Sequence, residues 1–179
     1  MVDRAIACDN GDSFAHHMIG TAFIGIGDFV RAKEHLELAL TLNPHYSYST
    51  VNLGLTLAIR GSHREGLSLI EKAFRVEPRM GPAMEGVPLY VHCIMGDVDA
   101  AIADSERIKN PFACYHLLLA ASLAQAGRDQ EAKHQLALFE EKRTPWYDVP
   151  AFAHWFDFLG AKADRDRMRD GFRKLGVEL

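Results

Sequence analysis

The sequence predicts an all-α protein built from repeated helical hairpins, and two observations carry this prediction. Within each of two adjacent segments the apolar residues recur at helical spacing, so each predicted helix has one face suited to a buried seam. The two segments also repeat one pattern at a fixed distance of 34 residues, as the following pairs show: Ile19/Leu53, Gly20/Gly54, Gly27/Gly61, Leu36/Ile70, Ala39/Ala73 and Pro44/Pro78. A period of this length is typical of stacked helical units.

Each copy of the pattern predicts a helix, a tight turn and a second helix. The first hairpin (13–45) contains helices at about 13–26 and 29–42, and the second (46–80) contains helices at about 46–60 and 63–76. Gly27 and Gly61 lie in the turns, because glycine enters the left-handed region of backbone space without a side-chain clash. Pro44 and Pro78 end the second helices.

This pattern resembles the tetratricopeptide repeat (TPR) family. It has small residues where two helices must touch, such as Gly20 and Gly54, and a proline at the end of each unit. The resemblance implies a right-handed superhelical TPR solenoid of helical hairpins with a C-terminal helical cap. The sequence departs from the family at Gly66, which stands where alanine is expected and should cost about 1 kcal/mol of helix propensity.

The composition limits the kinds of partner and the compartment that we expect. The net charge of −4 gives no case for nucleic acid or for an anionic membrane as a partner. No apolar run approaches the roughly 20 residues that span a bilayer, and residues 1–12 lack the apolar core of a signal peptide. The three cysteines, Cys8, Cys93 and Cys114, are unpaired in spacing and fit a reducing cytoplasm, which is the expected location.

The first residues suggest that the pattern begins before the chain does. One period before Ala39 and Pro44 lie Ala5 and Asn10, so residues 1–12 resemble the tail of an upstream repeat. We expect a fragment of a longer protein, and the alternative is a natural N-terminal arm. Without the upstream repeat, the first helix would be uncovered and would favour self-association. A homodimer is therefore one expected state.

After residue 80 the pattern loosens and then recovers. Gly96 and Gly127 mark the turns of a third hairpin (81–111), with a short second helix at about 97–108, and of a fourth hairpin (112–145). Pro88 would remove a backbone donor inside the entering helix, so the sequence predicts a kink or a new helix start at about 86–88.

The last segment, 146–179, has no repeat period and is predicted to form capping helices. Pro150 suits the start of a helix. Two apolar stripes follow, formed by Phe152, Trp155, Phe156 and Leu159 and then by Met168, Phe172 and Leu175.

A narrower resemblance covers about 113–179. This part is similar to the C-terminal TPR region of multidomain bacterial class III adenylate/guanylate cyclases, and winged-helix transcriptional regulators have similar tails. The resemblance carries no catalytic residue onto this chain. It implies an alternative function, that of a regulatory TPR segment of a bacterial signalling protein whose effector domain lies outside this sequence.

The residue pattern favours neither catalysis nor metal binding. His16 and His17 are neighbours on one helix and point about 100° apart, so they cannot share one metal ion. His92 beside Cys93 has the same difficulty, and the spacing of Cys114 and His116 suits a strand better than a helix. We therefore expect no enzyme, no cofactor and no bound metal.

The TPR resemblance implies a concave groove lined by the first helices, in which a protein or peptide partner binds. The groove positions of the family, carried over to this sequence, are Phe14, His17, Thr21, Ile24, Tyr48, Val51, Asn52, Leu55, Ile59, Tyr90, Leu117 and Gln125. These positions carry almost no charge, so an amphipathic helix or an extended peptide is the expected ligand. Packing against another domain of the same protein is the open alternative. Relatives that bind chaperones hold a C-terminal carboxylate with basic residues, but Ala83 and Val87 stand at those positions here.

Overall fold

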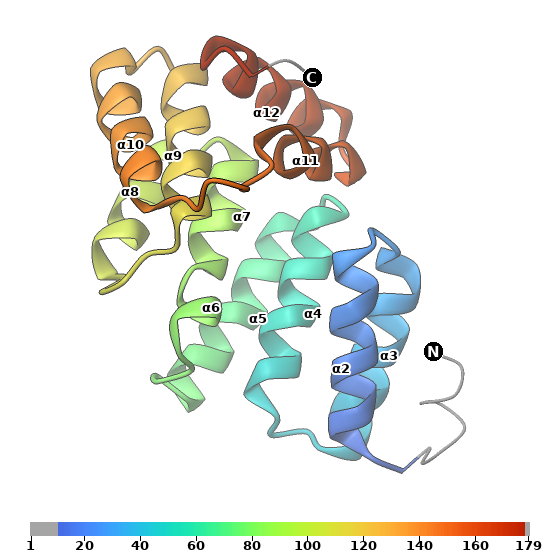
Figure 1. Cartoon of the computed structure of the whole chain (residues 1–179). Helices are drawn as coiled ribbons and strands as arrows, with labels where there is room; N and C mark the ends of the chain where they lie inside the picture. Colours follow the sequence, from blue (N-terminus) through green and yellow to red (C-terminus); the bar gives the residue numbers. More distant parts are fainter. Residues whose placement is uncertain (1–10, 178–179) are drawn as a thin grey trace. The chain divides into compact units, whose positions relative to one another are not determined.

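The structure is a computed structural model that describes residues 11–177. All regular structure in this range is helical, which confirms the predicted fold class. The chain divides into two compact units, Met1–Met80 and Gly81–Leu179, here called unit 1 and unit 2 and described separately (Figure 1). The predicted upstream-repeat tail, residues 1–12, lies almost entirely outside the described residues.

Unit 1 consists of two helical hairpins. Helix α2 (Ser13–Gly25) pairs with α3 (Phe29–Leu42), and α4 (Ser47–Ile59) pairs with α5 (His63–Val76). Helix α3 also packs against α4 and so joins the two hairpins. Each helix begins and ends within one residue of its predicted bounds.

The turn of each hairpin depends on its glycine. Gly27 and Gly61 have φ angles of 77° and 100°, which are the left-handed values predicted from the sequence. In the first turn the backbone N–H of Asp28 donates to the carbonyl of Phe23 at 3.0 Å, while the Asp28 carboxylate accepts from the N–H of Arg31 at 3.1 Å. Asp28 therefore ends α2 and starts α3, which fixes the angle between the two helices.

The two helices of the second hairpin are in backbone contact at Gly54 and Gly66. A Cβ atom on Gly54 would lie 2.6 Å from the carbonyl oxygen of Gly66, and a Cβ atom on Gly66 would overlap the carbonyl of Gly54 in turn. The departure from the family pattern at Gly66 thus has a packing reason that its helix propensity does not reveal. In the first hairpin the counterpart Ala32 faces Gly20, and that seam is filled by fully buried Leu36.

Unit 2 contains two further hairpins and the C-terminal segment. Its elements are α6 (Pro82–Glu85), α7 (Val87–Met95), α8 (Val98–Arg107), α9 (Ala113–Gln125), α10 (Asp129–Lys142), α11 (Val149–His154), the 3₁₀ helix η1 (Trp155–Phe158) and α12 (Lys162–Lys174). The predicted new helix start is confirmed, because α6 ends at Glu85 and α7 begins at Val87. Gly86 is required at this break, since any side chain there would overlap the ring of Tyr115.

The C-terminal segment packs on the first helices of unit 2. Helix α12 contacts both α9 and α7, and it does so at close range because a side chain at Gly171 would overlap the carbonyl of Ala121. Phe156 and Phe172 from this segment are completely buried. Residues without any repeat period therefore supply a large part of the unit 2 core.

The contact between Gly54 and Gly66 generates a stability prediction. Gly66→Ala should lower the free energy of unfolding by about 1–3 kcal/mol, because overpacking here forces two backbones apart. Gly25→Ala is the matched control, since a Cβ atom at this helical position meets nothing within 4 Å. It should leave stability unchanged or raise it by about 0.5–1 kcal/mol. Chemical denaturation measures both, and equal stability of the two variants would contradict the packing argument.

Candidate functional site

Four ring side chains gather at the start of the first helices of unit 1. We call Phe14, His17, Tyr46 and Tyr48 the aromatic cluster. The His17 ring centroid lies 4.9 Å from that of Tyr46, 6.4 Å from that of Tyr48 and 6.3 Å from that of Phe14, and the two tyrosine rings are 6.0 Å apart. The rings are thus in mutual contact, and His17 is the member that touches all the others.

Hydrogen bonds hold this cluster in place. His17 Nδ1 lies 3.1 Å from Ser49 Oγ, and the Tyr48 hydroxyl donates to the carbonyl of Met80 at 2.8 Å. Deeper in the unit the Asn52 amide donates to Thr21 Oγ1 at 2.8 Å. The first helices of the two hairpins are therefore tied together by polar bonds as well as by apolar contact.

The predicted partner-binding positions of unit 1 differ widely in exposure. Phe14 is 56% exposed, and Thr21, Tyr48 and Leu55 are half-buried. The remaining predicted positions of this unit are buried: His17, Ile24, Val51, Asn52 and Ile59. Within unit 1, the predicted positions that offer surface to a ligand are Phe14, Thr21, Tyr48 and Leu55.

The predicted positions of unit 2 lie under or beside the C-terminal segment. The Tyr90 ring stacks on Phe156 with centroids 6.3 Å apart and meets the edges of Phe152 and Trp155. Leu117 is fully buried.

Cations of α12 also reach the C-terminal ends of both first helices of unit 2. Arg167 donates to the carbonyl of Ile94, and Lys174 donates to the carbonyl of Gln125 at 3.3 Å. Residues 149–174 carry no repeat period, so their position over this face could not be predicted from the sequence pattern.

The aromatic cluster lies in a nearly uncharged setting. Helices α2 and α4 contain no aspartate, glutamate, lysine or arginine. Burial lowers the pKa of His17, and burial raises the pKa of Tyr46. Both shifts favour the neutral side chains, so at neutral pH the cluster presents rings and hydroxyl groups rather than charges.

A second polar contact in unit 1 joins His16 to His35. Their Nδ1 atoms are 3.0 Å apart and their rings are stacked with centroids 5.3 Å apart. His16 packs in the seam between α2 and α3, where it is 3% exposed. Its contact with His35 was not predicted. His116 and Gln135 are separated by the same 19 residues and are also bonded, at 2.8 Å. This recurring spacing is the sequence signal that could have indicated the pair.

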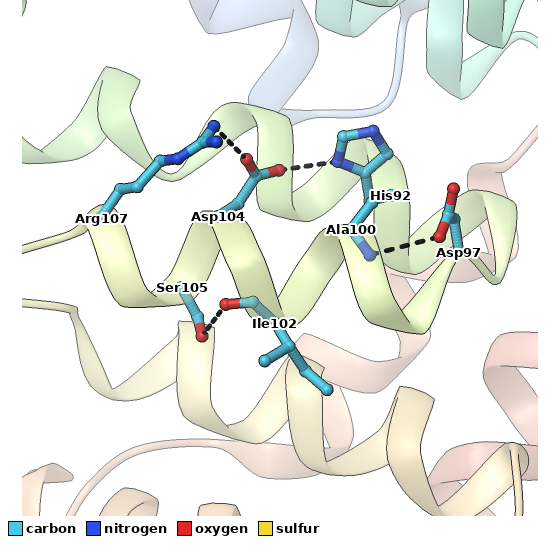
Figure 2. A network of polar contacts seen from close by, with 7 residues as sticks. All are labelled: His92, Asp97, Ala100, Ile102, Asp104, Ser105 and Arg107. Atoms are coloured by element: carbon cyan, nitrogen blue, oxygen red, sulfur yellow. Dashed lines mark hydrogen bonds and ion pairs between the residues drawn. The ribbon is translucent and has the colours of Figure 1, made fainter.

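In unit 2 an ionisable group of three residues ties α7 to α8. His92 Nδ1 lies 2.7 Å from one carboxylate oxygen of Asp104, and Arg107 approaches the other at 3.4 Å (Figure 2). Two neighbouring residues, Ser105 and Cys93, have side chains of the nucleophile type. The Ser105 hydroxyl donates to the carbonyl of Ile102, and burial raises the pKa of Cys93 to about 12. Neither neighbour is therefore an activated nucleophile, and the geometry fits a structural bridge between two helices.

The described part of the chain offers neither a metal site nor a membrane span. Residues 11–177 contain no group of three or more histidine, cysteine or acidic side chains placed to hold a metal ion. Within the same range no helix combines the length and the apolar character needed to cross a membrane.

The environment of the two described cysteines, Cys93 buried and Cys114 half-buried, predicts low thiol reactivity. Burial also raises the pKa of Cys114, and a pKa of about 12 leaves roughly one Cys93 thiol in ten thousand ionised at pH 8. In a Cys8→Ser variant, a disulfide reagent at pH 8 should modify Cys93 at least about a hundredfold more slowly than it does in guanidinium chloride. Rapid modification of Cys93 in the folded protein would show that this region opens readily.

Comparisons with known proteins identify the fold. No family model matches the sequence, and no curated protein matches it either, so the resemblance of 113–179 to cyclase-type proteins finds no support. A solved structure does match: the crystal structure of YrrB, described as a TPR protein with an unusual peptide-binding site. The alignment covers 97% of this chain and 89% of YrrB, with a TM-score of 0.56 and 16% sequence identity. At that identity the likeness shows the fold alone, and the fold is that of a TPR protein.

Proposed function

We propose that this protein is a non-catalytic interaction module that binds a peptide, or an apolar segment of a partner protein, on the first-helix face of unit 1. The observation that carries this proposal is the aromatic cluster. Phe14 exposes more than half of its surface beside two half-buried tyrosines, on a face whose two helices carry no acidic or basic side chain apart from histidine. Exposed aromatic groups of this kind are typical of binding surfaces.

The chemistry of this face defines the ligand. Without lysine or arginine on α2 or α4, a carboxylate or phosphate would lose its hydration there and gain no ion pair. An apolar or aromatic side chain instead gains contact with Phe14 and Leu55, while backbone groups of a peptide can bond to tyrosine hydroxyl oxygens. The ligand is therefore an uncharged apolar segment.

Unit 2 supplies an example of such binding within the chain. There Tyr90 and the first helices receive aromatic side chains from residues 149–158 and the close-packed helix α12. The same class of surface in unit 1 would accept a segment of similar character from a partner. The description of YrrB as a TPR protein with a peptide-binding site agrees with this proposal.

A peptide-display screen tests the proposal and its location. The immobilised full chain should enrich peptides rich in apolar and aromatic residues. Phe14→Glu and Leu55→Glu should each weaken capture of these peptides by at least about tenfold, because each places a charge in the apolar contact.

The matched control is Val76→Glu, which changes an exposed apolar residue on the second helix α5. Capture by this variant should equal that of the parent, and helical circular dichroism should be the same for all three variants. Retained binding by Phe14→Glu and Leu55→Glu would place the site on another surface, and failure to enrich any peptide would argue against the proposed function.

A further inference from the structure

We infer that unit 1 contains an acid-sensitive switch: in acid, three histidines packed in its helix seams take up protons that the packed hairpins cannot hold, and the α2–α3 hairpin opens. Three histidines form the switch. His16 and His35 lie in the seam between α2 and α3, and His17 lies between α2 and the start of α4. The effect on partner binding rests on the proposed function, since His17 belongs to the aromatic cluster, but the opening itself does not.

The geometry of the His16–His35 pair sets a limit on its protons. With the two Nδ1 atoms 3.0 Å apart, one nitrogen must donate and the other must accept. The pair can share one added proton in this contact but cannot hold two, because two N–H groups would then face each other. His16 Nε2 is buried and has no hydrogen-bond partner among the described residues, so a charge on this ring would also lack solvation.

The surroundings of the pair offer little compensation. Burial is the main cause that lowers the pKa of His35, and His16 lowers it further. On α3, Glu34 raises this pKa, and Arg31, which lies over the Phe23 ring at 4.4 Å, lowers it. Lys33 and Glu37 on the same helix pair with each other. On α2 and α4 the ionisable side chains are the histidines themselves and Tyr48.

His17 is in a similar position. The groups that face it are the rings of Phe14, Tyr46 and Tyr48 and the hydroxyl of Ser49, all of them neutral at this pH. Burial lowers its pKa. A proton on His17 therefore introduces a charge that meets rings and a hydroxyl group in these contacts rather than a carboxylate.

The direction of the pH effect follows from these shifts. The pKa values of His17 and His35 are lowered in the folded protein, whereas an unfolded histidine titrates at about 6.5. Between the lowered values and about 6.5 the unfolded chain binds more protons than the folded chain does. Stability is therefore complete above about pH 7 and falls as the pH drops through this window.

Unit 2 provides an internal comparison. Helices α9 and α10 match α2 and α3 at a shift of 100 residues, and there Leu117 replaces His17 and Gln135 replaces His35. One histidine, His116, remains on that seam. Elsewhere in unit 2, a proton on His92 would face the carboxylate of Asp104 (Figure 2), which acts against acid-induced opening.

Hydrogen exchange of the full chain, without any partner, tests the switch. Amide exchange is measured by mass spectrometry at pH 7.5 and pH 5.5 and corrected for the intrinsic rate. Each excluded proton changes an opening constant by up to about tenfold per pH unit. Opening of α2–α3 should therefore rise several-fold at pH 5.5, by up to about tenfold for each proton that the folded hairpin excludes, and opening of α9–α10 should rise less. An equal rise in both pairs, or no rise in α2–α3, would overturn the inference.

A variant that copies the second hairpin assigns the effect to the histidine pair. One period after His16 and His35 stand Thr50 and Leu69, which α4 and α5 already accommodate. His16→Thr/His35→Leu should reduce the rise in α2–α3 opening by at least about threefold, whereas His45→Gln, a change at an exposed loop histidine, should not alter it. An unchanged rise in the double variant would remove the pair from the switch.

Histidine titration of the unaltered protein by NMR gives an independent check that does not depend on the variants folding. At least two of the nine histidines should titrate below the ordinary histidine value of about 6.5. If all nine titrate at 6.5 or above, the switch does not exist. Peptide binding that is absent while α2–α3 still opens in acid would reject the proposed function and leave this inference standing.

Discussion

Direct backbone contact between paired helices is the constraint on which the hairpins depend. At Gly54 and Gly66 the two chains approach so closely that neither position has room for a methyl group. This spacing lets Ile70 and Ala73 fill the seam with 1% and 2% of their surface exposed. In the first hairpin Gly20 instead makes room for the side chain of Leu36. The short distance between helices then fixes the turn, which must reverse the chain within a few residues and needs a left-handed glycine to do so.

The first helices serve different purposes in the two units. In unit 2 the first helices are covered by the chain's own residues 149–174, and Tyr90 becomes part of a dense group of aromatic rings. In unit 1 the matching helices carry Phe14, which remains exposed, and His17, which is buried among neutral rings. Both faces derive from one sequence pattern, yet one completes a core and the other is proposed as a ligand surface.

The sequence was sufficient to predict the hairpins because their determinants are local. Gly27 and Gly61 each determine a turn within four or five neighbouring residues, and the helix bounds follow from them. The reason for Gly66 could not be predicted, because it depends on a contact with Gly54 on another helix. Capping helices were predicted for the C-terminal segment, but their place over α7 and α9 was not, since residues 149–174 carry no period that relates them to the helices they pack on. In the candidate site, the exposed or half-buried positions Phe14 and Tyr48 were proposed from the TPR pattern, whereas the partners Tyr46, Ser49 and His35 are brought to their places only by the fold.

The hydrogen bond from Arg167 to Ile94 joins residues 73 positions apart, and it has a consequence for synthesis of the chain. Unit 1 is built from contacts between neighbouring hairpins, so it can form while later residues are still being added. Unit 2 cannot cover the apolar side of α9 until α12 has emerged, because Phe172 and Gly171 lie near the end of that helix. During this interval the nascent chain exposes the side of α9 around Ala121 to water, and transiently exposed apolar surface of this kind favours aggregation.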